Sequence, residues 1–400
     1  MAGRGESGED VRARRPAQIK IAADEGKARG LDEAAGFLYA QSEKVKELED
    51  MDELKGIIAG IKGLDQKAVA AAQVQLDSLT KPPGSLGVLE EVVLKIAGIT
   101  GEARPQVKNK CLTVFAGDHG ICEEGVSAFP AEVTPQMVMN FVHGGAAINA
   151  LCRQAGAKVE VVDIGVATPV EMEGVTQCNI RRGTRNFAAG PAMTREETLA
   201  ALNAGAQIAL RQVKDGANLL ATGEMGIGNT TPSSALLVVF AGIDVEKAIG
   251  RGTGIDDAGL ERKAAAIKKG LAANKPDASD PIGVLAAVGG LEIAGIAGYI
   301  IGAAAAGVPV IVDGFISTAA ALTAARIAPG SVDYMLPSHS SEEPGHILAL
   351  QALGMEPMLR LRMRLGEGTG AALAMHLVEA ACRIQSEMAT FADAGVSNKE

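Results

Sequence analysis

The sequence has few aromatic residues and little positive charge. Aromatic side chains make up 3% of the 400 residues, tryptophan is absent, and the net charge at pH 7 is −10. A nucleic acid would be repelled by this charge, and its bases would find few rings on which to stack. We therefore expect no nucleic-acid partner, and an anionic ligand would have to be held by backbone amides and a few local cations.

Cysteine and histidine are sparse and scattered, with five of each. Because no CxxC, HxxxH or HExxH pattern occurs, the sequence predicts neither a disulfide framework nor a metal site. Unpaired cysteines fit a reducing compartment. The first twenty residues carry acids and no apolar run, unlike a signal or transit peptide. We therefore expect a cytoplasmic protein with no metal and no cofactor.

One long apolar stretch, residues 283–312, raises the question of a membrane-spanning helix. Glu292 is its only charged residue, and its length is compatible with a span. Gly290, Gly307 and Pro309, however, divide it into a helix of about fifteen residues and a β-branched run. This division favours a buried helix followed by a buried strand, and we expect no membrane partner.

What the chain does contain is enough apolar residues for a large core. Hydrophobic residues make up 47% of the sequence and charged residues 22%, as is typical of globular proteins. From about residue 100, short β-branched runs alternate with alanine-rich stretches of helical spacing. The alternation predicts an α/β fold with a doubly wound, mostly parallel, Rossmann-like sheet. Single helices are expected near 64–79, 135–154 and 194–213, and helical structure from about 345 to 393.

The same patterns predict a large domain and a small one. Residues 1–36 are charge-rich and aperiodic, and we expect a disordered extension there. Residues 100–338 are expected to form the large α/β domain. Residues 37–99 and 339–400 are expected to contribute the helices of the small domain, which is therefore built from segments on both sides of the large one.

Polar residues follow four of the predicted strands. Ligands of doubly wound sheets bind beyond the carboxyl ends of the strands. These polar side chains are therefore expected to lie at the rim of one site. They are Asp118, His119, Glu224, Asp313, Ser338 and His339.

A glycine-rich run, GEMGIGNTTP (223–232), joins one of these strands to the next helix. Its backbone amides, with Asn229, Thr230 and Thr231, could approach a phosphate. The run matches neither GxGxxG nor the Walker A pattern, and a tight turn with a threonine N-cap is the alternative. Glu224, an unusual residue for a strand end, favours a ligand site.

A second acid, Glu367, lies between two glycines in LGEGTGAA (365–372). Burial would raise its pKa towards the range of a general base, although a first-turn acid at a helix start has the same pattern. The run GRGTG (250–254), with Lys263 further along, is either a second anion-binding loop or a flexible connection.

Nine segments resemble one known family, the nicotinate-nucleotide–dimethylbenzimidazole phosphoribosyltransferases of cobamide lower-ligand activation. They occur in order over about residues 50 to 395, and the ordered set is more specific than any single segment. The segments are LTKPPGSLG (79–87), AGDHGICEEGVSAFP (116–130), VVDIGV (161–166), GPAM (190–193), GEMGIGNTTPSSA (223–235), VGGLEIAG (288–295), VDGFIS (312–317), PSHSSEEPG (337–345) and MRLGEGTGAALA (363–374).

The resemblance implies transfer of phosphoribosyl from nicotinate mononucleotide to the ring nitrogen of an aromatic base, giving an α-ribotide and nicotinate. It implies that Glu367 is the general base and that Glu224 faces the ribose and the developing positive charge. It also implies a homodimer whose site is completed near the subunit interface. The implied substrate-binding residues are Gly226, Gly228, Asn229, Thr230, Thr231, Gly252, Lys263, Asp313, Gly314, Ser338, Phe129, Met137, Leu365 and Gly366.

Two other functions remain compatible with the sequence. One is another phosphoribosyl or nucleoside glycosyl-transfer enzyme, such as a nucleoside phosphorylase. The other is a non-catalytic nucleotide-binding module, against which the presence of both Glu224 and Glu367 argues. The residue at Phe129 is expected to influence base choice, and the first fifty or so residues have no counterpart in the resemblance.

Overall fold

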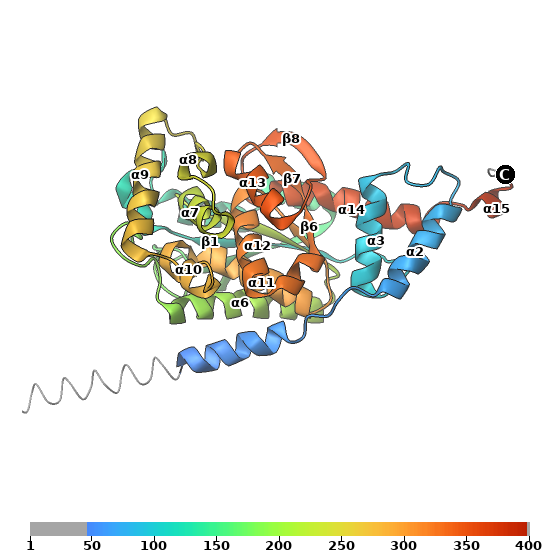
Figure 1. Ribbon diagram of the computed structural model, residues 1–400, viewed down its shortest axis with the longest axis horizontal. Helices are drawn as coiled ribbons and strands as arrows, with labels where there is room; N and C mark the ends of the chain where they lie inside the picture. Colours follow the sequence, from blue (N-terminus) through green and yellow to red (C-terminus); the bar gives the residue numbers. More distant parts are fainter. Residues whose placement is uncertain (1–45, 398–400) are drawn as a thin grey trace, which may run out of the picture. The chain divides into compact units, whose positions relative to one another are not determined.

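A parallel sheet of six strands, with the order β3-β2-β1-β4-β5-β6, forms the core of the described chain. Figure 1 shows helices around it. The computed structural model describes residues 46–397, and contacts divide the chain into units 1–49 and 50–400. The second unit contains the whole sheet, with strands β1 (Lys110–Gly117), β2 (Ala157–Gly165), β3 (Val175–Gln177), β4 (Leu219–Met225), β5 (Val310–Val312) and β6 (Met335–Pro337). A second, two-stranded parallel sheet in the same unit pairs β7 (His339–Ser341) with β8 (Leu359–Met363).

Helices connect the strands and cover both faces of the larger sheet. They are α2 (Gln66–Ser78), α3 (Val88–Thr100), α4 (Val133–Val142), α5 (Ala147–Ala155), α6 (Arg195–Lys214), α7 (Thr230–Ala241), α8 (Val245–Ala248), α9 (Asp257–Asn274), α10 (Pro281–Val288), α11 (Leu291–Ala305), α12 (Phe315–Ile327), α13 (Pro344–Leu353), α14 (Thr369–Glu387) and α15 (Phe391–Ala394). Residues 46–58 are helical as well. Two short 3₁₀ helices, η1 (Gly120–Glu124) and η2 (Pro329–Tyr334), lie in the connections.

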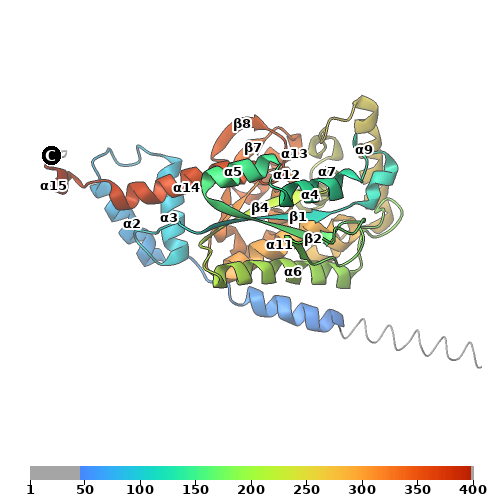
Figure 2. The same cartoon turned by 180° about the vertical axis from the view of Figure 1, so that it is seen from behind.

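Successive side chains of β1 enter two different cores, as the pleat of a strand requires. Cys111 and Phe115 pack into one core, which includes apolar residues of α6, α10, α11 and α12. Leu112 and Val114 pack into the other, with residues of α4, α5 and α14. Figure 2 shows α6 and α11 on one side of β1 and β2, with α4 and α5 on the opposite side. The doubly wound α/β fold predicted from the sequence is confirmed.

The apolar stretch 283–312 forms helix and strand, as predicted. It contains most of α10, all of α11 and then β5, and these elements are almost wholly buried in the protein core. Within residues 46–397, no helix has the length and apolar character needed to cross a bilayer.

Helices α2 and α6 confirm two of the single helices, and their starts have a clear chemical cause. The Asp65 carboxylate accepts the N–H of Lys67 and Ala68, which caps α2. Thr194 and Glu197 form a reciprocal capping box at the start of α6.

Two predictions about local structure were wrong. The single helix expected at 135–154 is two helices, because Gly144 has a φ of 75° and ends α4 before α5 begins. The stretch 345–393 is not all helical, because β8 lies between α13 and α14. The sequence of β8, LRLRM, alternates apolar and charged residues, which is a strand pattern rather than a helical one.

The helices α2 and α3 pack against each other and against α14, and Leu79 forms an isolated β-bridge with Thr390. Segments from both ends of the described chain therefore lie together. The division into a large and a small domain stays a prediction, and the extension expected at 1–36 lies outside the described residues.

The close packing of α6 on α11 depends on glycine. A Cβ on Gly298 would lie 1.8 Å from the carbonyl oxygen of Leu202, and one on Gly205 would lie 1.8 Å from that of Gly295. Real Cβ atoms do not come this close to backbone oxygens, so at these two points the helices touch backbone to backbone. Any side chain at these positions would separate them.

Replacement of Gly298 by alanine is therefore expected to lower the free energy of unfolding by about 1–3 kcal/mol through overpacking. Urea unfolding followed by circular dichroism measures the change. Gly56→Ala is the matched control, because a Cβ there meets no atom within 4 Å and alanine favours helix by about 0.5–1 kcal/mol. Equal stability of the two variants would contradict the backbone contact.

Candidate active site

A cavity with about 1000 Å³ of empty space, partly open to solvent, lies beyond the carboxyl ends of β4 and β5. It is lined by residues from the loops that follow these strands, from α4, from β7 and from the segment that joins β8 to α14. The lining residues are Phe129, Val133, Met137, Glu224, Met225, Gly226, Ile227, Asn229, Thr230, Gly252, Thr253, Asp313, Gly314, Phe315, Ile316, Ser317, His339, Ser341, Glu343, Arg364, Leu365, Gly366 and Glu367.

Glu224 stands near the end of β4 and is 6% exposed. Its carboxylate accepts the side-chain N–H of Asn229 and, at 3.4 Å, the backbone N–H of Glu367. Burial, with the added repulsion of Asp313 and Glu292, raises the pKa of Glu224 to about 8 despite these two hydrogen bonds. Without a bound cation, Glu224 is therefore mostly protonated at neutral pH.

Glu367 occupies a backbone conformation that few side chains adopt. Its φ is 62°, and the flanking Gly366 and Gly368 have φ values of 84° and 93°. Gly366 also packs directly on the other acid, since a Cβ there would lie 2.2 Å from Oε1 of Glu224. The two glycines therefore serve the geometry of the turn and the close approach to Glu224.

The carboxylate of Glu367 lies at the start of α5. It accepts the backbone N–H of Ile148 at 3.3 Å, and the residue is 7% exposed. Burial raises the pKa of Glu367, the Ile148 N–H opposes this, and the Asp313 charge adds to the rise. A raised pKa and a cavity-lining position are the properties that a general base requires.

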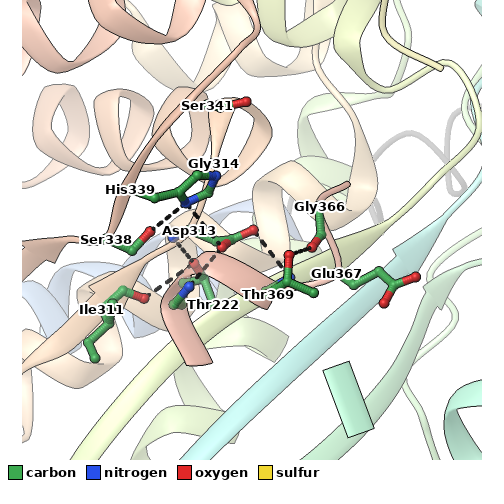
Figure 3. Close-up of polar contacts among 12 residues, drawn as sticks. Thr222, Ile311, Asp313, Gly314, Ser338, His339, Ser341, Gly366, Glu367 and Thr369 are labelled. Carbon is green, nitrogen blue, oxygen red and sulfur yellow. Dashed lines mark hydrogen bonds and ion pairs between the residues drawn. The ribbon is translucent and has the colours of Figure 1, made fainter. Parts of the chain in front are cut away.

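Asp313 holds the turn around Glu367 in place. Its carboxylate accepts the N–H of Gly368 at 3.2 Å and of Ala371 at 2.9 Å, at the start of α14. His339 Nδ1 lies 3.8 Å from Asp313 Oδ1. Figure 3 shows Asp313 between His339 and the turn that contains Gly366 and Glu367. Asp313 thus connects the end of β5 with the helix that follows Glu367.

A group of polar residues, which we call the Gly252 cluster, forms another part of the cavity wall. Thr230, Gly252, Glu343 and Arg364 line the cavity, and Lys263 stands behind Thr230. Lys263 Nζ donates to Thr230 Oγ1 at 2.9 Å and to the Gly250 carbonyl at 3.0 Å. The Gly252 N–H donates to Glu343 at 2.9 Å, and its carbonyl accepts from Arg364. Burial lowers the pKa of Lys263 to about 8, with Glu343 opposing the shift.

Apolar residues complete the cavity lining. Phe129, Val133 and Met137 come from α4 and the segment before it, and Leu365 comes from the turn next to Glu367. Phe129 is 51% exposed and Leu365 is 59% exposed. Large apolar side chains with this exposure offer a surface for a flat hydrophobic ring.

The structure brings most of the residues predicted for the site into the cavity lining. Four of them lie outside it: Gly228, Thr231, Lys263 and Ser338. Lys263 stands directly behind Thr230, so it still belongs to the Gly252 cluster. Ser338 is buried and its hydroxyl contacts His339 Nδ1 at 3.1 Å, while Ser341, three residues later, lines the cavity instead.

Asp118 and His119, expected at the common rim, do not line the cavity. His119 Nε2 lies 2.7 Å from Glu292 Oε1 in a fully buried pair beneath Gly226. Burial lowers the pKa of His119, but the charge and hydrogen bond of Glu292, together with the charges of Asp118 and Glu224, raise it overall. Three of the four predicted strand ends therefore meet at the cavity. The residues after β1 lie beneath the turn that follows β4, which contains Gly226.

Several cavity residues were missed by sequence reasoning, notably Thr253, Ser341, Glu343 and Arg364. Each lies within or beside one of the motifs described above: Thr253 is part of GRGTG, Ser341 and Glu343 belong to PSHSSEEPG, and Arg364 precedes LGEG. Among residues 46–397, no three His, Cys, Asp or Glu side chains are placed to hold a metal ion.

Comparison with known proteins gives consistent matches. A family model described as phosphoribosyltransferase matches residues 61–396. The nicotinate-nucleotide–dimethylbenzimidazole phosphoribosyltransferase of Desulforamulus reducens is 57% identical over 342 residues, which cover 85% of this chain and 97% of the relative. The protein of the same name from Geobacter sp. strain M21 is 53% identical over 349 residues, 87% of this chain and 100% of that one. A crystal structure of the enzyme so named from Thermus thermophilus is 46% identical, with a TM-score of 0.80, and the match covers 84% of this chain and all of that one.

The raised pKa of Glu224 predicts a pH-dependent cost to stability. Between pH 4.5 and about 8, the Glu224 carboxyl group loses its proton in the unfolded state but keeps it in the folded state. The free energy of unfolding should therefore fall with rising pH, by up to about 1.4 kcal/mol per pH unit. Glu224→Gln removes this contribution, so its stability relative to wild type should increase from pH 5 to pH 8.

Urea unfolding at pH 5, 6, 7 and 8 measures this difference, with Glu356→Gln as a control at an exposed carboxylate. Parallel stability curves for wild type and Glu224→Gln would show that Glu224 is ionised in the folded protein throughout this range.

Proposed function

The chain belongs to the phosphoribosyltransferase family whose model it matches over residues 61–396, and we propose that it uses nicotinate mononucleotide as donor. The acceptor is dimethylbenzimidazole or a similar aromatic base, the substrates named for relatives 52–57% identical to it. The products are the α-ribotide of the base, a precursor of the cobamide nucleotide loop, and nicotinate. The observation that carries the proposal is the contact of two buried acids, Glu224 and Glu367, within one cavity.

The transfer breaks the bond between the ribose C1′ and the nicotinate nitrogen and forms one from C1′ to a base nitrogen. The leaving ring is a pyridinium that departs as a neutral ring nitrogen, so it needs no acid. The incoming base loses the proton on its other nitrogen. Charge stabilisation, a base and placement of two rings at one carbon are therefore what the protein must supply.

We assign the base role to Glu367. Its carboxylate is buried at the cavity wall and oriented by the Ile148 N–H. Its raised pKa allows it to accept the proton of the acceptor ring while nitrogen attacks C1′. The fixed turn between Gly366 and Gly368 keeps the carboxylate in place while the proton moves.

We assign to Glu224 the role of stabilising the positive charge of the nucleotide donor. A pyridinium or an oxocarbenium-like ribose beside it favours its ionised form, because opposite charges lower a carboxyl pKa. Entry of the cationic nucleotide should therefore displace the proton that Glu224 holds at neutral pH. The hydrogen bonds from Asn229 and from the Glu367 N–H then stabilise the carboxylate.

The other binding roles follow from the lining. The Gly252 cluster, with Asn229 and Gly226 from the turn after β4, supplies the amides, hydroxyl and cations for the phosphate. Asp313 and Gly314 line the side of the cavity that we assign to the nucleotide donor. Phe129, Met137 and Leu365 contact the acceptor ring, so their shape sets the preferred base. We further propose that the protein acts in the cytoplasm.

Glu367→Gln is expected to reduce kcat by about 10² to 10⁴, since a positioned base contributes a factor of that size. The assay supplies nicotinate mononucleotide with a panel of benzimidazoles, purines and phenols and identifies the ribotides by mass. The KM for the nucleotide should change little, because glutamine retains the size and hydrogen-bonding groups of the side chain. Glu356→Gln, at an exposed position, is the matched control.

Near-normal turnover of Glu367→Gln with dimethylbenzimidazole would refute the base assignment. Product formation from a nucleoside and phosphate, with none from nicotinate mononucleotide, would instead identify a nucleoside phosphorylase. Nucleotide binding without any ribotide would identify a non-catalytic binding module.

The protein is expected to be a homodimer in solution. Large apolar side chains are exposed on the single chain, including Val74, Val88, Ile347 and Leu361, and such side chains gather at subunit interfaces. Sedimentation equilibrium at micromolar concentration should give twice the mass of one chain. A monomeric mass together with full activity would contradict the proposal.

A further inference from the structure

Glu343 is an acidic residue in the part of the cavity to which the proposed function assigns an anionic ligand, the phosphate of the nucleotide. It is the residue before α13, it is 6% exposed, and it lines the cavity. Its Oε1 accepts the Gly252 N–H at 2.9 Å. Its Oε2 is buried and has no hydrogen-bond partner within residues 46–397. A buried carboxylate oxygen without a partner is costly, which points to an interaction that forms only with a ligand.

The surroundings of Glu343 are tightly packed and cationic. Lys263 from α9 and Arg364 from the segment after β8 are the charged groups that act on it. Gly250 lies against it, since a Cβ there would be 2.1 Å from Oε2. His346, on the same helix, is kept neutral because burial and the nearby His339 lower its pKa to about 3. The carboxylate therefore has little room to move away.

A dianionic phosphate in the Gly252 cluster would meet this carboxylate as a like charge. The repulsion would oppose the attraction of Lys263 and Arg364 and leave Oε2 still without a donor. Protonation removes both problems, because a neutral carboxyl group no longer repels the phosphate and offers it an O–H donor. No negatively charged group of the cluster would then face the ligand.

We propose that Glu343 takes up a proton from solvent when the phosphate of the nucleotide binds. The proton goes to Oε2, whose O–H then donates to a phosphate oxygen, while Oε1 continues to accept the Gly252 N–H. Glu343 is thus a phosphate-recognition residue that makes nucleotide binding proton-linked. The inference rests on the proposed function for the identity of the nucleotide.

The electrostatics of the site agree with this assignment. Burial raises the pKa of Glu343, although Lys263, the Gly252 N–H and Arg364 oppose the rise. A bound phosphate offsets the effect of these cations and so raises the pKa further. Lys263, with a pKa of about 8, also gains proton affinity from the phosphate, so the test must separate the two residues.

Calorimetric titration at pH 8, in two buffers of different ionisation enthalpy, measures the protons taken up on binding. The probes are nicotinate mononucleotide and ribose 5-phosphate, which carries the phosphate but no positive ring. At this pH a phosphate monoester, with a second pKa of about 6, is already dianionic. Wild type is compared with Glu343→Gln, whose amide always donates, and with Glu342→Gln, which removes the neighbouring exposed charge.

Proton uptake in Glu343→Gln should be smaller than in wild type by up to one proton, with both probes. Between pH 7.5 and 8.5, the Kd of wild type should also rise more steeply than that of the variant, by up to about tenfold per pH unit. Glu342→Gln should match wild type. With ribose 5-phosphate, which has no positive ring to displace the Glu224 proton, the residual uptake in Glu343→Gln reports on Lys263. With nicotinate mononucleotide it also contains the proton that Glu224 releases.

Equal proton uptake in wild type and Glu343→Gln would overturn the inference and leave the proposed function intact. Binding of ribose 5-phosphate with the expected difference, but no binding of nicotinate mononucleotide, would support Glu343 and reject the proposed donor. Failure of both probes to bind wild type would reject both.

Discussion

The hydrogen bonds from the start of α14 to Asp313 determine how the cavity is built. They join the Gly368 and Ala371 amides to the end of β5, and so place the preceding turn on top of β4. Gly366 then lies on the Glu224 carboxylate, and the Glu367 amide donates to it. The position of both acids thus follows from one buried carboxylate at a helix N-terminus, where the helix dipole favours negative charge.

Three buried acids in one cavity make the site costly for the fold. Burial raises the pKa of Glu224, Asp313 and Glu367 alike, and the charge of Asp313 raises the pKa of Glu224 and of Glu367 further. The burial of two apolar cores, one on each face of the parallel sheet, offsets the free-energy cost of these buried acids. The same repulsion prepares the cavity for a cationic donor, because a positive ring relieves it.

The sequence predicted the fold class and much of the cavity because the signals were local. Glycines on both sides of Glu367 and the strand before Glu224 can be recognised within ten residues. The place of Glu343 could not be predicted in this way, since its partner Gly252 is 91 residues away and a glutamate before proline is ordinary. Asp118 and His119 were predicted at the cavity because they follow a strand, but a position after a strand does not show whether a side chain reaches the cavity or lies buried beneath it. The residue that holds His119 below Gly226 is Glu292, which comes from the distant helix α11. The strand β8 was overlooked because its short alternating run was flanked by helical patterns on both sides.

Order of synthesis has a consequence for this cavity. Glu224 and Asp313 belong to strands of the central sheet, but the turn that covers them and the amides that bind Asp313 begin only at Gly366. A nascent chain that has completed β5 and β6 therefore carries these carboxylates without their partners from α14. The helix α14 thus completes both the second core and the site, and a polypeptide that ends before it lacks this part of each.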